Sequence, residues 1–233
     1  MKNLLVILAF IGLTFGGLAQ EDSQSFAAPD YKAIEKAVVD PNGDCHYPTL
    51  LQRFNSGDTS LTEVQLQHLY YGTIYQESYH PYRSGDWYDE YRAAKDSAEE
   101  YPEALKRALS AAEKGVREAP VSLRARRCYA YCCYDLYGRD DVRTRIAVVQ
   151  FYQLIDIILH SGRGLSSEEA WHVISVSDEY VVLSELGLQP QGQSLVGNCD
   201  RFQVSSEEYD VEEVYFNTLP SLIYLEKMYN DKK

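Results

Sequence analysis

Residues 102–120 read PEALKRALSAAEKGVREAP, and they form the clearest helical pattern in the chain. Their apolar side chains recur at the spacing that places them on one face of a helix, at Ala104, Leu105, Ala108, Leu109, Ala112 and Val116. Proline is favoured in the first turn of a helix and interrupts its interior, so Pro102 opens the helix and Pro120 ends it. The pattern therefore predicts a helix over residues 102–119.

Two more helices are expected directly after Pro120, over residues 121–137 and 141–160. Gly138 separates them, and Asp140 is positioned to cap the second one. Two helices joined by so short a connection pack as an antiparallel hairpin. We therefore expect a mainly α-helical protein built from helical hairpins.

The packing of these hairpins stays open between two arrangements. Ala108, Ala112 and Gly115 stand where a tetratricopeptide repeat places small residues, which favours a tetratricopeptide-like stack. The neighbouring positions do not follow that repeat, so the alternative is an irregular helical bundle with the same short connections. Both arrangements bury the same helical faces.

Shorter helices are predicted nearer the N-terminus. Asp30 is expected to cap the first of them, and a second follows Pro48. Ser60 and Glu63 have the spacing of a capping box before the third. An aromatic loop with proline and glycine interrupts the pattern after this helix, and helical spacing resumes at Trp87.

The pattern changes again in the last quarter of the chain. A capping box that begins at Ser166 predicts a helix up to Gly187, although its valines and isoleucine also suit a strand. Two alternating runs then predict a β-hairpin, and a closing helix starts near Pro220. We expect a helical domain over residues 30–165, and a helix, β-hairpin and C-terminal helix over residues 166–233 packed on the same domain. The strand positions are Phe202, Val204, Val211, Val214 and Phe216.

The N-terminus has the form of a secretory signal peptide over residues 1–19. Lys2 precedes an apolar run at Leu4–Phe15, and a small residue at Ala19 precedes the expected cleavage point. A run of about 12 apolar residues is shorter than the roughly 20 that cross a bilayer. We therefore expect no membrane span, a flexible leader over residues 20–29, and export to the periplasm or the cell exterior.

The charge of the chain excludes one class of partner. Its 22 basic and 35 acidic residues give a net charge of −13. Such an acidic protein is a poor binder of nucleic acid. Its five histidines show no pairing at metal-ligand spacing, so neither a metal nor another cofactor is expected.

Several short phrases follow one another through nearly the whole mature chain. They are YKAIEKAVVD at 31–40, YPTLLQRF at 47–54, DTSL at 58–61, LYYG at 69–72, YHPY at 79–82, the pair Glu179 and Tyr180, and YFN at 215–217. In this order and spacing they resemble a family of secreted Bacteroides-type proteins that carry a domain of unknown function. The resemblance implies export and a chain of this length, and it supplies no catalytic residues.

Tyrosine is abundant, with 20 residues in the chain, and many of them lie near Trp87. Aromatic rings supply contact area at a low entropic cost, so a platform for a protein, peptide or glycan is expected if the rings share one exposed face. The alternative is that they pack between helices and pin the loop. The candidate binding residues are Tyr79, Tyr82, Trp87 and Tyr88.

Buried carboxylates are the second candidate feature. Asp156 and Glu179 stand among apolar residues, where a carboxylate needs a partner. They are predicted to form a buried polar centre, either through structural hydrogen bonds to arginine or tyrosine or as the acid–base pair of a hydrolase. Among the five cysteines, Cys45 and Cys199 are the candidate disulfide, with free buried thiols as the alternative.

Arginines between residues 124 and 145 concentrate positive charge on one helical pair. They predict either an anion site or ion pairs with acids of adjacent helices, for which the candidates are Glu99, Glu100 and Glu118.

The sequence favours a non-catalytic module over an enzyme. It contains no nucleophile elbow and no cysteine-protease signature. The expected function is therefore binding of a protein, peptide or glycan in the cell envelope. The alternatives are a hydrolase of envelope or dietary polymers that uses the buried carboxylates, and a purely structural envelope protein. A deep pocket converging on Asp156 or Glu179 would favour the hydrolase.

Overall fold

A computed structural model describes residues 26–82, 85–98 and 100–230 of the chain. The signal peptide predicted for residues 1–19 lies outside the described residues, as does the leader up to residue 25. In the remainder of the leader, the backbone N–H of Ala27 donates to the carbonyl oxygen of His160 at 3.1 Å, and Pro29 is buried. This end of the leader is therefore attached to the folded protein.

The N-terminal group consists of α2 (Tyr31–Val39), α3 (Tyr47–Asn55) and α4 (Glu63–Gly72), followed by the 3-10 helix η2 (Thr73–Tyr75). The predicted cap of the first helix is confirmed, because the Asp30 carboxylate accepts hydrogen bonds from two backbone N–H groups in the first turn of α2.

The capping box predicted at Ser60 and Glu63 is wrong, because Thr62 and Gln65 form it two residues later. The Ser60 hydroxyl instead donates to the Asp58 carboxylate at 2.6 Å. Asp58 thus holds the loop before α4, and the helix begins where the next hydroxyl is free to cap it.

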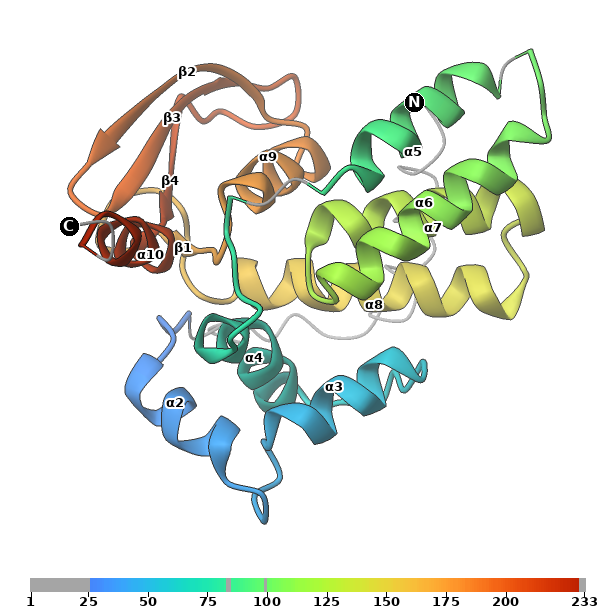
Figure 1. The fold of residues 1–233 in the computed structure, drawn as a ribbon. Coiled ribbons are helices and arrows are strands. Elements are labelled where there is room, and N and C mark those ends of the chain that lie inside the picture. The colour runs from blue at the N-terminus through green and yellow to red at the C-terminus, as the bar shows by residue number, and fades with distance from the viewer. Residues whose placement is uncertain (1–25, 83–84, 99, 231–233) are drawn as a thin grey trace, which may run out of the picture.

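Four helices form a stack in which each one packs on the next in the chain, as Figure 1 shows: α5 (Trp87–Ser97), α6 (Ala104–Glu118), α7 (Leu123–Tyr137) and α8 (Val142–Leu159). The predicted helical hairpins are confirmed by this arrangement. The cap of α8 is Asp141 rather than the predicted Asp140, since the Asp141 carboxylate accepts from the backbone N–H of Arg143.

Small residues on α6 provide the space for the start of α5. Trp87 is only 6% exposed, and a Cβ atom added at Gly115 would lie 2.5 Å from its indole ring. Ala108 and Ala112 are fully buried in the same cluster. These small side chains therefore let the two helices approach closely around one large ring.

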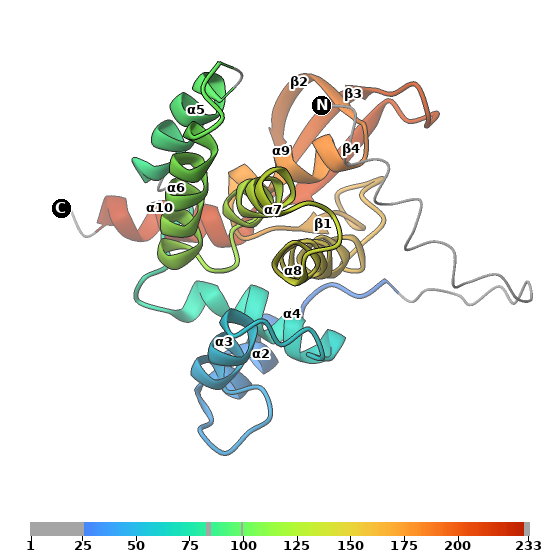
Figure 2. The ribbon, with the colours of Figure 1, turned by 90° about the vertical axis from the view of Figure 1, so that its right-hand side faces the viewer.

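Helix α8 lies between α7 and the N-terminal group. It packs on α7 along one side and on α4 along another, and Figure 2 shows α2 to α4 on the far side of α8 from the rest of the stack. Its sequence is apolar on most sides, and nine of its residues are buried. The N-terminal group, α8, α9 and the sheet share the main hydrophobic core.

The C-terminal part contains a four-stranded mixed sheet in the order β1-β4-β3-β2. The strands are β1 (Trp171–His172), β2 (Gln189–Val196), β3 (Cys199–Ser205) and β4 (Glu213–Asn217), with α9 (Val176–Glu185) before β2 and α10 (Leu219–Asn230) at the end. The antiparallel pairing of β3 with β4 confirms the predicted hairpin, and α10 confirms the closing helix.

The helix predicted from Ser166 is wrong in its first half. The Ser166 hydroxyl does accept from the backbone N–H of Glu169 at 3.3 Å, but no helix follows. Trp171 instead pairs in parallel with Phe216 of β4, and the two rings pack with centroids 5.4 Å apart. The helix begins later, at α9, where the Ser175 hydroxyl caps it.

Strand β2 was not predicted, because its sequence QPQGQSLV lacks the alternation of a half-buried strand. It lies at the edge of the sheet and is largely exposed. A two-residue turn at Gly197 and Asn198 joins it to β3, and the φ of +62° at Gly197 is the left-handed conformation that such turns require. Across the described residues, the helices all fall short of the length and hydropathy that a membrane-spanning segment needs.

Candidate functional site

The predicted aromatic platform separates into two groups in the structure. Trp87 and Tyr88 lie at the start of α5, with ring centroids 5.5 Å apart. Trp87 is buried against α6, and the Arg124 guanidinium lies over the Tyr88 ring at 4.9 Å from its centroid. These two rings thus pack within the helical stack.

Tyr79 and Tyr82 belong to the other group, beside the sheet. The Tyr79 hydroxyl donates to the carbonyl oxygen of Ile174 at 2.7 Å, and the Tyr82 hydroxyl donates to that of Ser221 at 3.3 Å. Both rings contact Tyr224 of α10. Tyr79 is half-buried and Tyr82 is 41% exposed, so only Tyr82 of this pair presents a large exposed surface.

The predicted centre of Asp156 and Glu179 does not form. Asp156 lies on the exposed side of α8, whereas Glu179 is 0% exposed in α9. Burial of part of the carboxylate nevertheless raises the pKa of Asp156. Asp178 is the buried acid that the sequence interpretation missed.

Asp178 is held by hydrogen bonds from two other helices. The Tyr70 hydroxyl of α4 donates to its Oδ2 at 2.8 Å, and the backbone N–H of Leu123 in α7 donates to its Oδ1 at 3.2 Å. Burial raises the pKa of Asp178 to about 7, against the effect of these donors. The helical spacing from Asp178 to the buried Val181 and Val182 was the signal that could have identified it.

Glu179 lies next to Asp178 in the chain, and its surroundings differ. Neither of its side-chain oxygens has a hydrogen-bond partner among the described residues. Burial first, and then the charge of Asp200 on β3, raise the pKa of Glu179 to about 10. At neutral pH the Glu179 carboxyl therefore keeps its proton.

Two exposed tyrosines flank this carboxyl pair. Tyr82 is 41% exposed and Tyr180 is 43% exposed, and Glu179 and Asp200 raise the pKa of both phenols, after the effect of burial. The Tyr180 hydroxyl donates to Gln193 of β2 at 2.8 Å. We call Tyr82, Tyr180 and Asp200, with Glu179 beneath them, the carboxyl–tyrosine site.

The two candidate disulfide cysteines are free in the structure, as are Cys128, Cys132 and Cys133. Cys45 lies in the loop between α2 and α3, and Cys199 starts β3, where its thiol donates to the carbonyl oxygen of Ser167 at 3.6 Å. The two thiols belong to separate parts of the molecule and form no bond.

Several arginines form ion pairs, although not with the acids that were expected. Arg127 contacts Glu185 at 3.6 Å. Arg143 contacts Asp141 at 2.8 Å. Their partners are thus an acid of α9 and the cap of α8 rather than Glu100 or Glu118. Glu99 lies outside the described residues.

These features define a mainly helical protein with a C-terminal mixed sheet and a carboxyl–tyrosine site between the sheet, α9 and the loop before α5. The chain belongs to the family described as Domain of unknown function (DUF4919), whose model matches residues 32–227. No curated protein and no solved structure matches it. The match covers the whole sheet and seven complete α-helices of the described chain.

Proposed function

We propose that the protein is an exported, non-catalytic binding module of the cell envelope, and that it binds a glycan at the carboxyl–tyrosine site. The observation that supports this proposal is the placement of two half-exposed rings, Tyr82 and Tyr180, beside the carboxyl pair of Glu179 and Asp200. The C–H faces of a sugar pack on aromatic rings, and its hydroxyl groups donate to carboxylates.

Glu179 lies beneath the site as a neutral acid. It keeps its proton at neutral pH, so it adds no negative charge beside Asp200. Asp200 is half-buried, and its side-chain oxygens accept hydrogen bonds from the ligand. The Tyr82 and Tyr180 hydroxyls already donate hydrogen bonds to Ser221 and Gln193, so the two rings offer their faces to the ligand.

A hydrolase is the second candidate, and the proximity of the Glu179 and Asp200 carboxyl groups is the observation in its favour. Glu179 is 0% exposed, which keeps it from contact with a substrate. Neither the cleft between α5 and α6 nor the cleft between α3 and α8 has Glu179 or Asp156 in its lining. Binding is therefore the favoured function.

Thermal unfolding of residues 20–233 with a panel of envelope glycans and polysaccharides tests the proposal, because a ligand of the native state raises the midpoint. At least one glycan is expected to raise it, and Tyr82→Ala combined with Tyr180→Ala is expected to abolish the rise. Tyr101→Ala is the matched control, since Tyr101 is 51% exposed in the loop between α5 and α6.

Two results would reject the proposal: a panel without any shift, or a shift that the double variant retains. Release of reducing sugar ends during the same incubations would favour the hydrolase. Export is tested separately, by locating the protein in fractionated cells with and without residues 1–19.

A further inference from the structure

A cleft of about 530 Å³ lies between the end of α3 and the helical stack. Its walls come from the end of α3 and the turn that follows, from α6, from α7 and from α8. A volume in this range is typical of sites for small molecules. Its lining includes the side chains of Asn55, Arg117, Arg126, Tyr129, Ile146 and Gln150.

Arg126 lines this cleft and is buried, with 3% of its surface exposed. Its Nε donates to the carbonyl oxygen of Pro120 at 2.6 Å, its Nη1 donates to Gln150 Oε1 at 3.0 Å, and its Nη2 donates to Asn55 Oδ1 at 2.9 Å. All three acceptors are neutral. Because a guanidinium carries five N–H donors, these bonds leave two for a ligand.

The cleft therefore contains a buried positive charge. No carboxylate among the described residues forms a hydrogen bond or ion pair with it. Burial lowers the pKa of Arg126 to about 10, so the side chain is still charged at neutral pH. An uncompensated buried charge is unfavourable. Such a charge is costly for an apo protein and becomes favourable when an anion enters.

The other charges in the lining leave one positive charge in excess. Arg143 is neutralised by Asp141, to which it donates from Nε and Nη2 at 2.9 and 2.8 Å. Arg117 and Glu113 have opposite charges and lie on the same helix. Arg126 is left as the excess charge, and a ligand with a single negative charge matches it.

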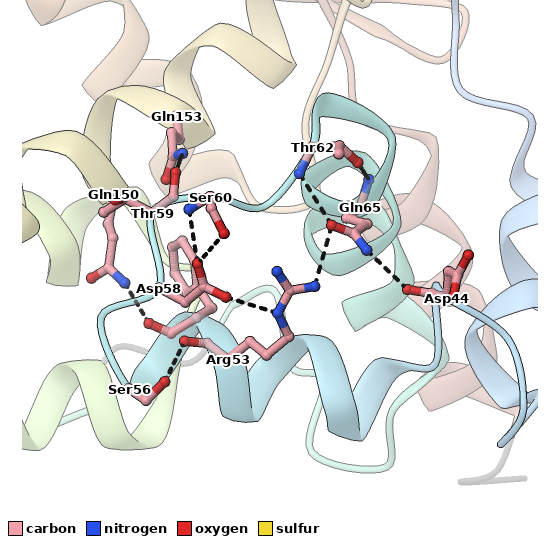
Figure 3. A network of polar contacts seen from close by, with 11 residues as sticks. Asp44, Arg53, Ser56, Asp58, Thr59, Ser60, Thr62, Gln65, Gln150 and Gln153 are labelled. Atoms are coloured by element: carbon pink, nitrogen blue, oxygen red, sulfur yellow. Dashed lines mark hydrogen bonds and ion pairs between the residues drawn. The ribbon is translucent and has the colours of Figure 1, made fainter.

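Figure 3 shows the polar contacts around the end of α3 and the loop that follows it, beside this cleft. Gln150 donates from Nε2 to the carbonyl oxygen of Phe54, which turns its Oε1 toward Arg126. Arg53 contacts Asp58 at 2.8 Å, and Asp58 in turn accepts from the backbone N–H of Ser60 at 2.8 Å. The loop from α3 to α4 is thereby held against α8.

We propose that this cleft binds a small organic monocarboxylate, whose carboxylate receives hydrogen bonds from the Arg126 guanidinium. The planar fork of arginine matches a carboxylate in shape, and the ion pair strengthens both hydrogen bonds. Arg117, which is exposed at the rim, offsets the repulsion that Glu113 would exert on an approaching anion. Tyr129 and Ile146 provide half-buried surface for the body of the ligand. This site is separate from the carboxyl–tyrosine site, so the two proposals can fail independently.

Calorimetric titration of the mature chain with pairs of probes tests the assignment. Galacturonate is compared with its methyl ester, and N-acetyl-alanine with its amide, so that each pair differs in the charged group. Inorganic phosphate is the third probe. We expect at least one acid to bind, and its neutral partner to bind at least about tenfold more weakly.

Arg126→Lys keeps the positive charge and removes the planar fork, and it is expected to weaken binding of the acid at least about tenfold. Arg117→Ala is a second variant that leaves the buried network intact, and it is expected to weaken binding about threefold, with a loss that shrinks at high salt. Arg145→Ala is the matched control, because that side chain is 65% exposed on α8, outside the lining.

Three outcomes would overturn the proposal. Neither acid binds, or the neutral partners bind as tightly as the acids, or phosphate binds more tightly than both, which would reassign the cleft to phosphorylated ligands. If Arg126→Lys does not fold, the Arg117→Ala variant serves as the test. The proposal is contradicted if Arg117→Ala binds the acid as tightly as Arg145→Ala does.

Discussion

The Tyr70 hydroxyl donates a 2.8 Å hydrogen bond to Asp178, and this contact joins α4 to α9 across 108 positions of sequence. The same carboxylate accepts from the backbone of α7 at Leu123. The Tyr70 oxygen itself accepts from the backbone N–H of Ile174 at 3.4 Å. One buried phenol and one buried acid therefore link the N-terminal group, the helical stack, and α9 with the segment that precedes it.

Tyr70→Phe is expected to lower the free energy of unfolding by about 1–3 kcal/mol, because it leaves a buried carboxylate oxygen without its donor. The loss should be larger at pH 8 than at pH 6, since the pKa of Asp178 is about 7 and the ionised carboxylate depends most on that donor. Urea unfolding at the two pH values measures it. Tyr229→Phe, at a position 69% exposed, is the control, and an equal loss at both pH values would contradict the assignment.

Glu179 is expected to make the protein less stable as the pH rises. Its pKa is about 10 in the folded state against an ordinary value of 4.5, so between these values the native state holds a proton that the unfolded state has lost. The contribution of Glu179 to the free energy of unfolding is then highest below pH 4.5. It falls by up to about 1.4 kcal/mol for each pH unit between the two pKa values.

Glu179→Gln removes this titration and is expected to flatten the decline between pH 7.5 and 8.5. Asp178 has a pKa of about 7, so most of its own contribution falls below that window. Thermal or urea unfolding at several pH values measures the slope. Glu226→Gln, on the exposed side of α10, should leave the slope as in the wild type. An unchanged slope in Glu179→Gln would show that Glu179 is ionised in the folded protein.

Gly115→Ala is expected to destabilise the protein by about 1–3 kcal/mol, because the added methyl group overlaps the Trp87 indole at 2.5 Å. Alanine is otherwise the better helix former, so the usual gain from this substitution should be reversed. Ser110→Ala, at an exposed position of the same helix, is the control. The emission of Trp87 in the native protein reports whether the ring has moved, and a more stable Gly115→Ala variant would refute the close packing.

The five cysteines are expected to stay reduced, and alkylation followed by mass spectrometry measures this. In the native protein Cys45 should react first, because it is the half-exposed thiol of the five. Cys128 and Cys132 should react slowly, since burial raises their pKa to about 11 and about 12. A missing pair of thiols after denaturation, at Cys45 and Cys199, would show that the disulfide forms after all.

Helices with a strong apolar face were predictable from the sequence, and irregular polar strands were not. The segment that became α6 shows its spacing directly, and Asp30 signals its own cap. Strand β2 has no apolar alternation, since it lies at the sheet edge and is specified by its pairing with β3. The two residues of β1 are too few to give a pattern, and they are held by Phe216 and Asn217 of β4.

The candidate site was predictable only in part. Tyr82 and Glu179 were identified from aromatic clustering and from the apolar surroundings of the acid. Asp200 lies on a strand that was expected, yet its proximity to Glu179 depends on how the sheet packs on α9, which sequence spacing does not encode. The burial of Trp87 was likewise not predictable from sequence spacing, because it is determined by Gly115 on another helix.

The bond between Tyr70 and Asp178 also sets the order of events during synthesis. A ribosome adds about 5–20 residues per second, so the 108 residues that separate the partners take about 5 to 20 s to appear. Until then α4 lacks both its hydrogen-bond acceptor Asp178 and the residues of the sheet that complete the main hydrophobic core. The nascent chain therefore spends seconds without its native core, which is the unfolded state that passage through a secretion channel would require.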